Sequence, residues 1–479
     1  MAAPQGRITE TEEIKVQKSE KDPGTDRRKN DPAEREGGFQ VLLPRIPDRS
    51  FVVPGEGALK DGRGKNTQVI QQTIDRAAEA GGGRVILPAG IWYTGPVRLH
   101  SRIDLHLESG AVLLFSKSQE EYPLVRTDFE GMGALRTVSP LSAEDAEDVA
   151  ITGSGIIDGS GQLWRPVKRF KVTETEWRRL MGQSEHVLGA EDGQIWFPTA
   201  SARAGAAGVP CEDPAQQYDY YRPVMVQFMR CRRVLVEGVT LQNSPAWNLH
   251  PCFCEHVTVR NAVIRNPYCA QNGDGLDLES CRYAEIAHTS FDVGDDAICL
   301  KSGKGAEARR LQFPTEYVDI HDCTVFHGHG GFVVGSEMSR GVRHVRVRNC
   351  SFLGTDVGIR FKSAYGRGGV VEDILIQDIR MTNIVREAVI FTMKYTLGYE
   401  KPETVSSLVQ EDIPYFRDIV LERIVCLGAE LALCVEGLSQ KEDSISKITI
   451  RDSRFAARRR DSILYAQRIY LENIKYEQI

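Results

Sequence analysis

The stretch Val345-Arg-Val-Arg-Asn-Cys350 is one copy of a six-residue pattern that recurs through the C-terminal half of the chain. Its first and third residues are apolar, and its sixth is small or apolar. Successive copies begin 21 to 45 residues apart. The copies start at Val234, Val257, Ala284, Val318, Val345, Ile374, Ile419, Ile448 and Ile469.

This alternation has the period of a β-strand, and no helical period separates the copies. A short strand that returns once per repeat is typical of a solenoid built from stacked coils. We therefore predict an all-β chain that forms a single-domain, right-handed parallel β-helix. The sixth residues should stack inward, so that Cys323 and Cys350 belong to the core and are not metal ligands.

The N-terminal part of the chain differs from the repeats. Residues 1–38 are polar and charged, which predicts a disordered tail, and residues 39–479 are expected to form the β-helix domain. Thr67 is expected to cap an amphipathic helix that ends at Gly81-Gly82-Gly83. Such a helix would cover the open N-terminal end of the solenoid.

A large insertion interrupts the repeat at about residues 161–221. It contains a helix-like run from Thr173 to Leu180, followed by a long loop rich in small residues. Insertions of this size in solenoids usually lie over one face, often the binding face.

Composition and charge exclude several classes of protein. The 479 residues carry a net charge of −6 with a pI of about 6.0, which argues against a nucleic-acid partner. No run is apolar enough to cross a membrane, and no signal peptide is visible, so we expect a cytoplasmic protein, or a secreted one if a leader precedes this sequence. The eleven cysteines show no paired metal spacing and are expected to be reduced. The oligomeric state is left open.

The chemistry is expected in a second strand of each coil, aligned by its closing serine. The segments end at Ser280, Ser302, Ser336 and Ser363. Aligned in this way, Asp274 and Asp296 form one column on consecutive coils, about 5 Å apart. Asp295 and His329 form the adjacent column. The basic residues Arg360, Lys362 and Lys301 then project from the same face, with Lys301 in the column of Lys362.

Three clustered carboxylates can keep one acid protonated while the others stay ionised. This division suits hydrolysis of a glycosidic bond, and Arg360 and Lys362 could hold a carboxylate on the substrate. A calcium site or an acidic turn is the structural alternative. A non-catalytic carbohydrate-binding β-helix and a pectin lyase are the functional ones.

The motifs together resemble family 28 glycoside hydrolases, the polygalacturonases. They are Asn272-Gly-Asp274, Gly294-Asp-Asp296, Gly328-His-Gly330 and Arg360-Phe-Lys362, in the family's order. The resemblance implies inverting hydrolysis of α-1,4-linked galacturonate in pectic poly- or oligosaccharides, without a cofactor or metal ion. It implies that Asp295 is the general acid and that Asp274 and Asp296 activate water.

The resemblance also assigns the surrounding residues. His329 would tune Asp295, Arg360 and Lys362 would bind the galacturonate carboxylate, and Asn272 and Tyr395 would contact substrate. Trp247, His250 and Lys301 are further candidate contacts. The stretches around Trp247 and His329 are similar to exo-acting members, and the insertion could close one end of the cleft. Endo-acting and rhamnogalacturonan-cleaving members of the family are the alternatives.

Overall fold

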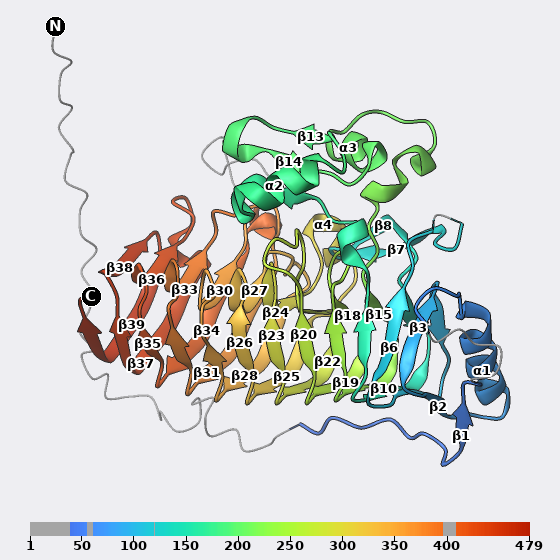
Figure 1. Cartoon of the computed structure of the whole chain (residues 1–479). Helices are drawn as coiled ribbons and strands as arrows, with labels where there is room; N and C mark the ends of the chain where they lie inside the picture. The colour runs from blue at the N-terminus through green and yellow to red at the C-terminus, as the bar shows by residue number, and fades with distance from the viewer. Residues whose placement is uncertain (1–38, 55–60, 119, 396–408) are drawn as a thin grey trace, which may run out of the picture.

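The computed structural model describes residues 39–54, 61–118, 120–395 and 409–479. The predicted tail, residues 1–38, lies outside this part of the chain. The described residues form a parallel β-helix in which each full coil contributes three strands (Figure 1). Strands of successive coils pair in parallel, which confirms the predicted fold class.

The strands form three parallel ladders that run the length of the solenoid. The first comprises β1 (Ser50–Val52), β2 (Gly83–Leu87), β5 (Ile103–Leu107), β10 (Glu147–Gly153), β16 (Arg232–Glu237), β19 (Glu255–Arg260), β22 (Arg282–Ala287), β25 (Thr315–His321), β28 (Val342–Arg348), β31 (Val370–Gln377), β34 (Tyr415–Glu422), β37 (Ile445–Ala456) and β39 (Gln467–Glu477). The second comprises β3 (Gly90–Thr94), β6 (Ala111–Phe115), β11 (Ile156–Asp158), β17 (Thr240–Gln242), β20 (Val263–Arg265), β23 (Ser290–Asp292), β26 (Thr324–His327), β29 (Ser351–Phe352), β32 (Arg380–Thr382) and β35 (Val425–Leu427), and it joins the first at β37. The third comprises β4 (Val97–Leu99), β9 (Leu141–Glu144), β15 (Val226–Met229), β18 (Leu249–Cys252), β21 (Leu276–Glu279), β24 (Asp296–Lys301), β27 (Gly330–Gly335), β30 (Ile359–Lys362), β33 (Glu387–Thr392), β36 (Leu431–Glu436) and β38 (Arg459–Leu464).

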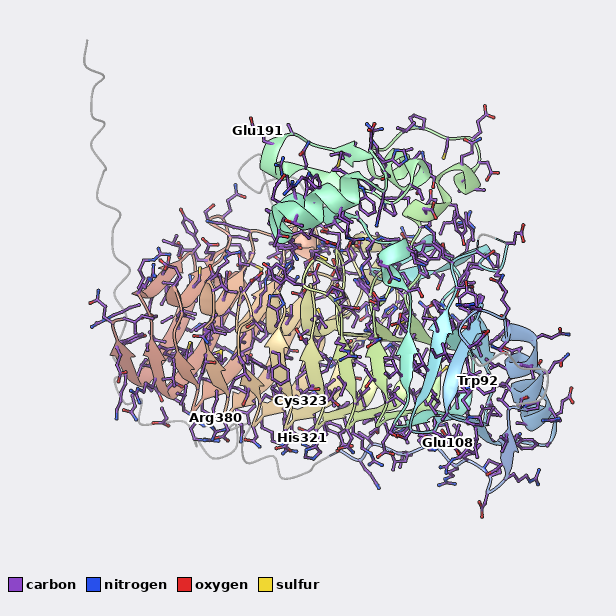
Figure 2. The ribbon with its side chains drawn as sticks, viewed as in Figure 1. Trp92, Glu108, Glu191, His321, Cys323 and Arg380 are labelled. Atoms are coloured by element: carbon purple, nitrogen blue, oxygen red, sulfur yellow. The ribbon has the colours of Figure 1, made fainter. Side chains whose placement is uncertain are left out.

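The six-residue pattern lies on the first ladder, in the predicted register. Each starting residue pairs with the next along the stack, from Val234 opposite Val257 to Ile448 opposite Ile469. The sixth residues point inward, and both Cys323, which is labelled in Figure 2, and Cys350 are buried in the core. The inward stack follows because only small or apolar side chains fit the turn between the first and second ladders.

Helix α1 (Thr67–Glu79) covers the N-terminal end of the solenoid, where Figure 1 shows it beside β2 and β3. It buries Ile70, Ile74 and Ala77 in the main core. The expected cap is wrong by one residue, because Asn66 precedes the helix and Thr67 lies inside it. The Thr67 hydroxyl instead accepts a hydrogen bond from the backbone N–H of Gly95 at 2.6 Å. This hydrogen bond to the neighbouring turn places Thr67 inside the helix and not at its cap.

The insertion at residues 161–221 lies above the third ladder as a separate layer (Figure 1). It contains β12 (Val167–Lys168), α2 (Glu174–Met181), β13 (Val187–Leu188), β14 (Ile195–Trp196) and α3 (Ala200–Ala206). Thr173 caps α2 by accepting a hydrogen bond from the Glu176 N–H at 3.2 Å. The predicted loop of small residues is in fact partly helical, since α3 is capped in the same way by Thr199.

A β-hairpin outside the three ladders was not predicted from the sequence. The strands β7 (Leu124–Phe129) and β8 (Met132–Thr137) pair as an antiparallel hairpin that is separate from the three ladders. A short helix, α4 (Gly305–Arg309), follows β24 on the same side of the molecule. Within the described ranges, none of the helices is long and apolar enough to span a bilayer.

An aromatic stack fills the core beneath the third ladder and should dominate its local stability. Phe361 is fully buried and stacks on Phe391 with ring centroids 4.6 Å apart. We expect Phe361→Ala to lower the unfolding free energy by about 3–5 kcal/mol, because the cavity cannot collapse between fixed coils. Urea unfolding followed by circular dichroism measures this. Phe326→Ala, at a residue that is 51% exposed, is the matched control and should shift the midpoint little. Equal midpoints for the two variants would contradict the expectation.

Candidate active site

Two consecutive coils bring the three predicted acids together, and the next coil adds His329. The backbone N–H of Gly275 donates to the carbonyl of Asp296 at 2.9 Å, and that of His329 donates to the carbonyl of Asp295 at 2.8 Å. The predicted register of the third ladder is therefore correct, which places Asp274 beside Asp296. Carboxylate oxygens of Asp274, Asp295 and Asp296 lie within 4.8 Å of one another.

Asp296 is held by the basic residues of the coil after next. Its Oδ2 accepts a hydrogen bond from Lys362 Nζ at 2.6 Å, and its Oδ1 lies 3.6 Å from Arg360 Nη1. The ring of Tyr395 lies 4.9 Å from Lys362 Nζ and 5.8 Å from Arg360 Cζ. The two cations and the aromatic ring therefore border the same carboxylate, as a site for an anionic sugar requires.

Asp295 is hydrogen-bonded to the imidazole of His329. Its Oδ1 lies 3.0 Å from His329 Nδ1, and His329 Nε2 lies 2.9 Å from Lys171 Nζ and 3.8 Å from Asp356 Oδ2. Burial alone would raise the pKa of Asp295, but the hydrogen bond from His329, with the positive charges of the His329–Lys171 pair and of Lys362, outweighs it and lowers that pKa. Asp295 is therefore ionised in the substrate-free protein.

Asp274 has the opposite environment. It is 3% exposed, and among the described residues its Oδ1 has no hydrogen-bond partner. Burial, followed by the negative charges of Asp277, Asp295 and Asp296, raises the pKa of Asp274 well above its usual value. Of the three acids, Asp274 is therefore the one whose surroundings favour the protonated form. This differs from the protonation state that the resemblance implied, in which Asp295 is the acid.

Beneath the three acids lies a buried network of charges. Lys301 Nζ lies 3.5 Å from Asp277 Oδ1 and 3.1 Å from Glu337 Oε2, and Arg367 also approaches Glu337. Burial and nearby acids raise the pKa of Asp277, which has the strongest charge effect on Asp274. Asp277 therefore belongs to the electrostatic surroundings of the three acids.

Three of the residues predicted to contact substrate have buried side chains that contact other protein groups. His250 is 0% exposed and its Nε2 lies 3.0 Å from Glu279 Oε2. Trp247 is buried below the hairpin, and the Lys301 ammonium lies 4.7 Å from its ring. Trp247, His250 and Lys301 were predicted to touch substrate, but the structure buries all three, with Trp247 stacked under Phe129 of the hairpin and Lys301 placed among buried acids.

The β7–β8 hairpin closes the face of the third ladder on the N-terminal side of the acids. Phe129 stacks on Trp247 at 4.3 Å, and Glu130 pairs with Lys304 at 3.0 Å. The tip residue Gly131 has φ of 71°, and a Cβ there would lie 1.9 Å from the Gly303 Cα. Only glycine permits this close approach, so the hairpin is fixed against the solenoid.

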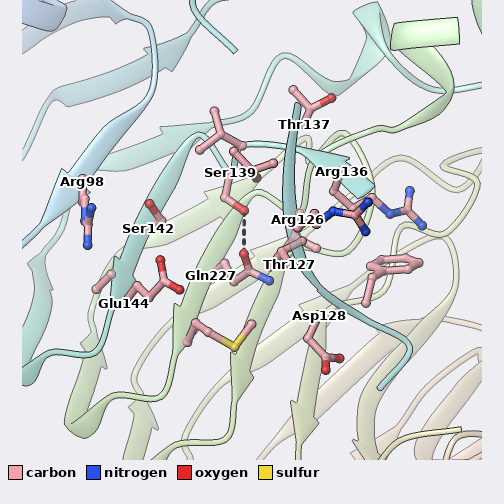
Figure 3. A pocket seen from close by; sticks show the side chains of 16 residues that line it. Arg98, Arg126, Thr127, Asp128, Arg136, Thr137, Ser139, Ser142, Glu144 and Gln227 are labelled. Atoms are coloured by element: carbon pink, nitrogen blue, oxygen red, sulfur yellow. Dashed lines mark hydrogen bonds between the residues drawn. The ribbon is translucent and has the colours of Figure 1, made fainter. Parts of the chain in front are cut away.

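Two cavities flank the hairpin. Figure 3 shows the one on its N-terminal side, about 220 Å³ in volume, lined by Arg98, Arg126, Glu144 and Gln227 among others. The other, about 280 Å³, lies between the hairpin and the insertion and reaches Asn272. The hairpin separates the first cavity from the second.

Arginine and lysine residues tie the insertion to the site. Arg222 Nη2 donates to Asn272 Oδ1 at 2.8 Å, and Arg222 Nη1 donates to the carbonyls of Pro245 and Gln271. Asn272 is thus oriented by Arg222 through its side-chain oxygen. Sequence reasoning missed both Arg222 and Lys171, because neither belongs to a repeating motif.

A hard cation could also bind three clustered carboxylates. Here, Lys362 already occupies Asp296 Oδ2 and His329 already occupies Asp295 Oδ1. The cluster is therefore better suited to proton transfer than to holding a metal ion.

Comparison with known proteins agrees with this geometry. The family model for glycosyl hydrolases family 28 matches residues 211–455, about half of the chain. The chain belongs to this family. All four motifs of the site lie inside the matched region of this family 28 member.

Among curated proteins, the exo-poly-alpha-D-galacturonosidase of Dickeya chrysanthemi is 31% identical over 350 residues, covering 71% of this chain and 56% of that protein. A probable polygalacturonase of Vitis vinifera is 29% identical, covering 68% and 59%. The family 28 chain thus spans less than two thirds of the length of these relatives. The crystal structure of a hyperthermoactive exopolygalacturonase from Thermotoga maritima is similar at TM-score 0.74 and 32% identity, over 91% of this chain and 94% of that one.

The raised pKa of Asp274 predicts a stability that depends on pH. The carboxyl is protonated in both states below its unfolded pKa of about 3.9, and its burial costs stability as pH rises from there to the folded pKa. We expect Asp274→Asn to remove this cost and to raise Tm by about 1–3 °C at pH 8, with a smaller gain at pH 4. Calorimetry at both values measures it, with Asp292→Asn at an exposed position as control. A gain that is equal at both pH values would contradict the assignment.

Proposed function

We propose that this chain is a glycoside hydrolase that cleaves α-1,4-galacturonosidic bonds and releases galacturonate from the ends of pectic poly- or oligogalacturonate. The observation that carries the proposal is the contact of Arg360 and Lys362 with Asp296, inside a cluster of three carboxylates. Acids for bond cleavage and cations for a sugar carboxylate are thereby combined in one site.

The roles follow from the electrostatics. Asp295 is proposed as the general acid, and Asp274 and Asp296 as the pair that activates water. A substrate carboxylate beside Arg360 and Lys362 adds negative charge and offsets the cations that lower the pKa of Asp295. The proton then moves from Asp274 to Asp295 within the cluster, whose oxygens lie within 4.8 Å. Asp274 becomes the base as Asp295 becomes the acid.

Exo action is proposed because the hairpin blocks the face on one side of the acids. The contacts of Phe129 with Trp247 and of Glu130 with Lys304 fix it there. A chain end fits a closed site, whereas internal cleavage needs an open groove. The relatives from Dickeya chrysanthemi and Thermotoga maritima are named as exo-acting enzymes, which supports the same choice.

Digestion of polygalacturonate tests the proposal. We expect monomeric galacturonate to accumulate while viscosity falls slowly, and proton NMR should show inverted configuration in the first product. Inversion rests on the family, since the carboxylates, within 4.8 Å, lie closer than the roughly 6.5–9.5 Å usual for inverting pairs. A ladder of oligomers would indicate endo action, and an unsaturated product absorbing in the ultraviolet would indicate a lyase.

The acid role is tested by Asp295→Asn. Loss of the general acid should lower kcat by about 10²–10⁴-fold, while trigalacturonate still binds in a calorimetric titration. Asp292→Asn, a nearby exposed carboxylate, should keep wild-type kcat. Retained turnover in the Asp295 variant would remove this residue from the acid role.

A further inference from the structure

We propose that Lys171, carried by the insertion, is a positioning residue that fixes the hydrogen of His329 on Nδ1 and so directs it at Asp295. The catalytic consequence rests on the proposed function, whereas the hydrogen-bond arrangement does not. The inference concerns a residue outside the matched family region, since that region begins at residue 211.

Lys171 reaches the site from outside the solenoid. It ends the short turn Arg169–Lys171 of the insertion and is only 8% exposed. Its Nζ lies 2.9 Å from the carbonyl oxygen of Gly294, 3.4 Å from that of Tyr268 and 2.9 Å from His329 Nε2. The Tyr268 ring lies 5.2 Å from the same Nζ. One ammonium group is therefore held by three partners.

These partners determine the state of the imidazole. An ammonium has three N–H groups and no lone pair, so with two directed at carbonyls the third must meet a lone pair on His329 Nε2. His329 is then neutral, and its hydrogen is on Nδ1, 3.0 Å from Asp295 Oδ1. If the proton moves from Nζ to Nε2, the amine still donates to both carbonyls, and Nδ1 still carries hydrogen.

The pair therefore holds one positive charge in either arrangement. The other charged or titratable groups that face it are Asp295, Asp356, Lys168 and Cys269. Double protonation of the pair would set an N–H of Lys171 against an N–H of His329 at 2.9 Å. His329 consequently keeps its hydrogen on Nδ1, directed at Asp295, while Lys171 is present.

Substitution of Lys171 should leave the hydrogen of His329 free to exchange between Nδ1 and Nε2. In Lys171→Met, Nε2 can take up a proton of its own, with a pKa near the ordinary histidine value of about 6.5, and the tautomers can exchange. The single positive charge that the wild-type pair shares would then lie wholly on the imidazole next to Asp295, which disfavours the protonated form that the general acid needs. Loss of the fixed tautomer should therefore lower kcat more than it changes KM.

The test compares Lys171→Met with Lys171→Arg and with Arg178→Met, an exposed cation on α2 of the same insertion. We expect kcat on trigalacturonate to fall about 10–100-fold in Lys171→Met, with KM within about twofold and a new ionisation near pH 6–7 in the kcat profile. Lys171→Arg, which keeps the donors, should recover most of the activity, and Arg178→Met should match wild type. An unchanged kcat and pH profile in Lys171→Met would overturn the proposal.

A second measurement separates this inference from the proposed function. Nitrogen-15 NMR of the unliganded protein, with His329→Gln to assign the resonance, should show hydrogen fixed on Nδ1 between pH 5 and 8. In Lys171→Met the same resonance should titrate. A titrating wild-type His329 would overturn the inference even if the enzyme is active, and a fixed one would support it even if galacturonan is not cleaved.

Discussion

The stacking of coils in register is the constraint on which the rest of this molecule depends. Each outward position of the third ladder lies one strand spacing from its equivalent on the next coil, so like residues are forced into columns. Asp274 stands beside Asp296 for this reason, with Asp295 in the neighbouring turn. The apolar residues that point inward, such as Ile298 opposite Phe332, fix the register and leave the acids no other arrangement.

Crowded acids need cations, and the same columns supply them. Lys362 donates a hydrogen bond to Asp296, which lies two coils earlier. Lys301 pairs with Asp277 on the preceding coil and with Glu337 on the following coil. Truncating one member of such a buried pair leaves an uncompensated charge, which is far more costly than the pair itself is stabilising. The site is thus an interleaved set of opposite charges, within which burial and the neighbouring acids raise the pKa of Asp274.

The repeat and the register could be predicted from sequence because both follow from alternation that recurs. The columns of Asp274 with Asp296 and of Asp295 with His329 were predicted in this way. The cover over the ladder could not be predicted, because the β7–β8 hairpin occurs once and its docking depends on the Gly131 contact with Gly303. Trp247 and His250 were consequently expected in the cleft, although the hairpin buries them.

The repeated coils and the segments that interrupt them also contribute differently to the site. The solenoid places the carboxylates, but its symmetry cannot decide which of them holds a proton, since equivalent positions receive similar surroundings. The distinction comes from groups that break the repeat: the imidazole of His329 on one coil, and Lys171 from the insertion behind it. Because Lys171 contacts the loop carbonyls as well as the imidazole, the insertion that walls the site also sets the direction of its hydrogen bond. A segment without any repeat therefore gives the repeated acids their different roles.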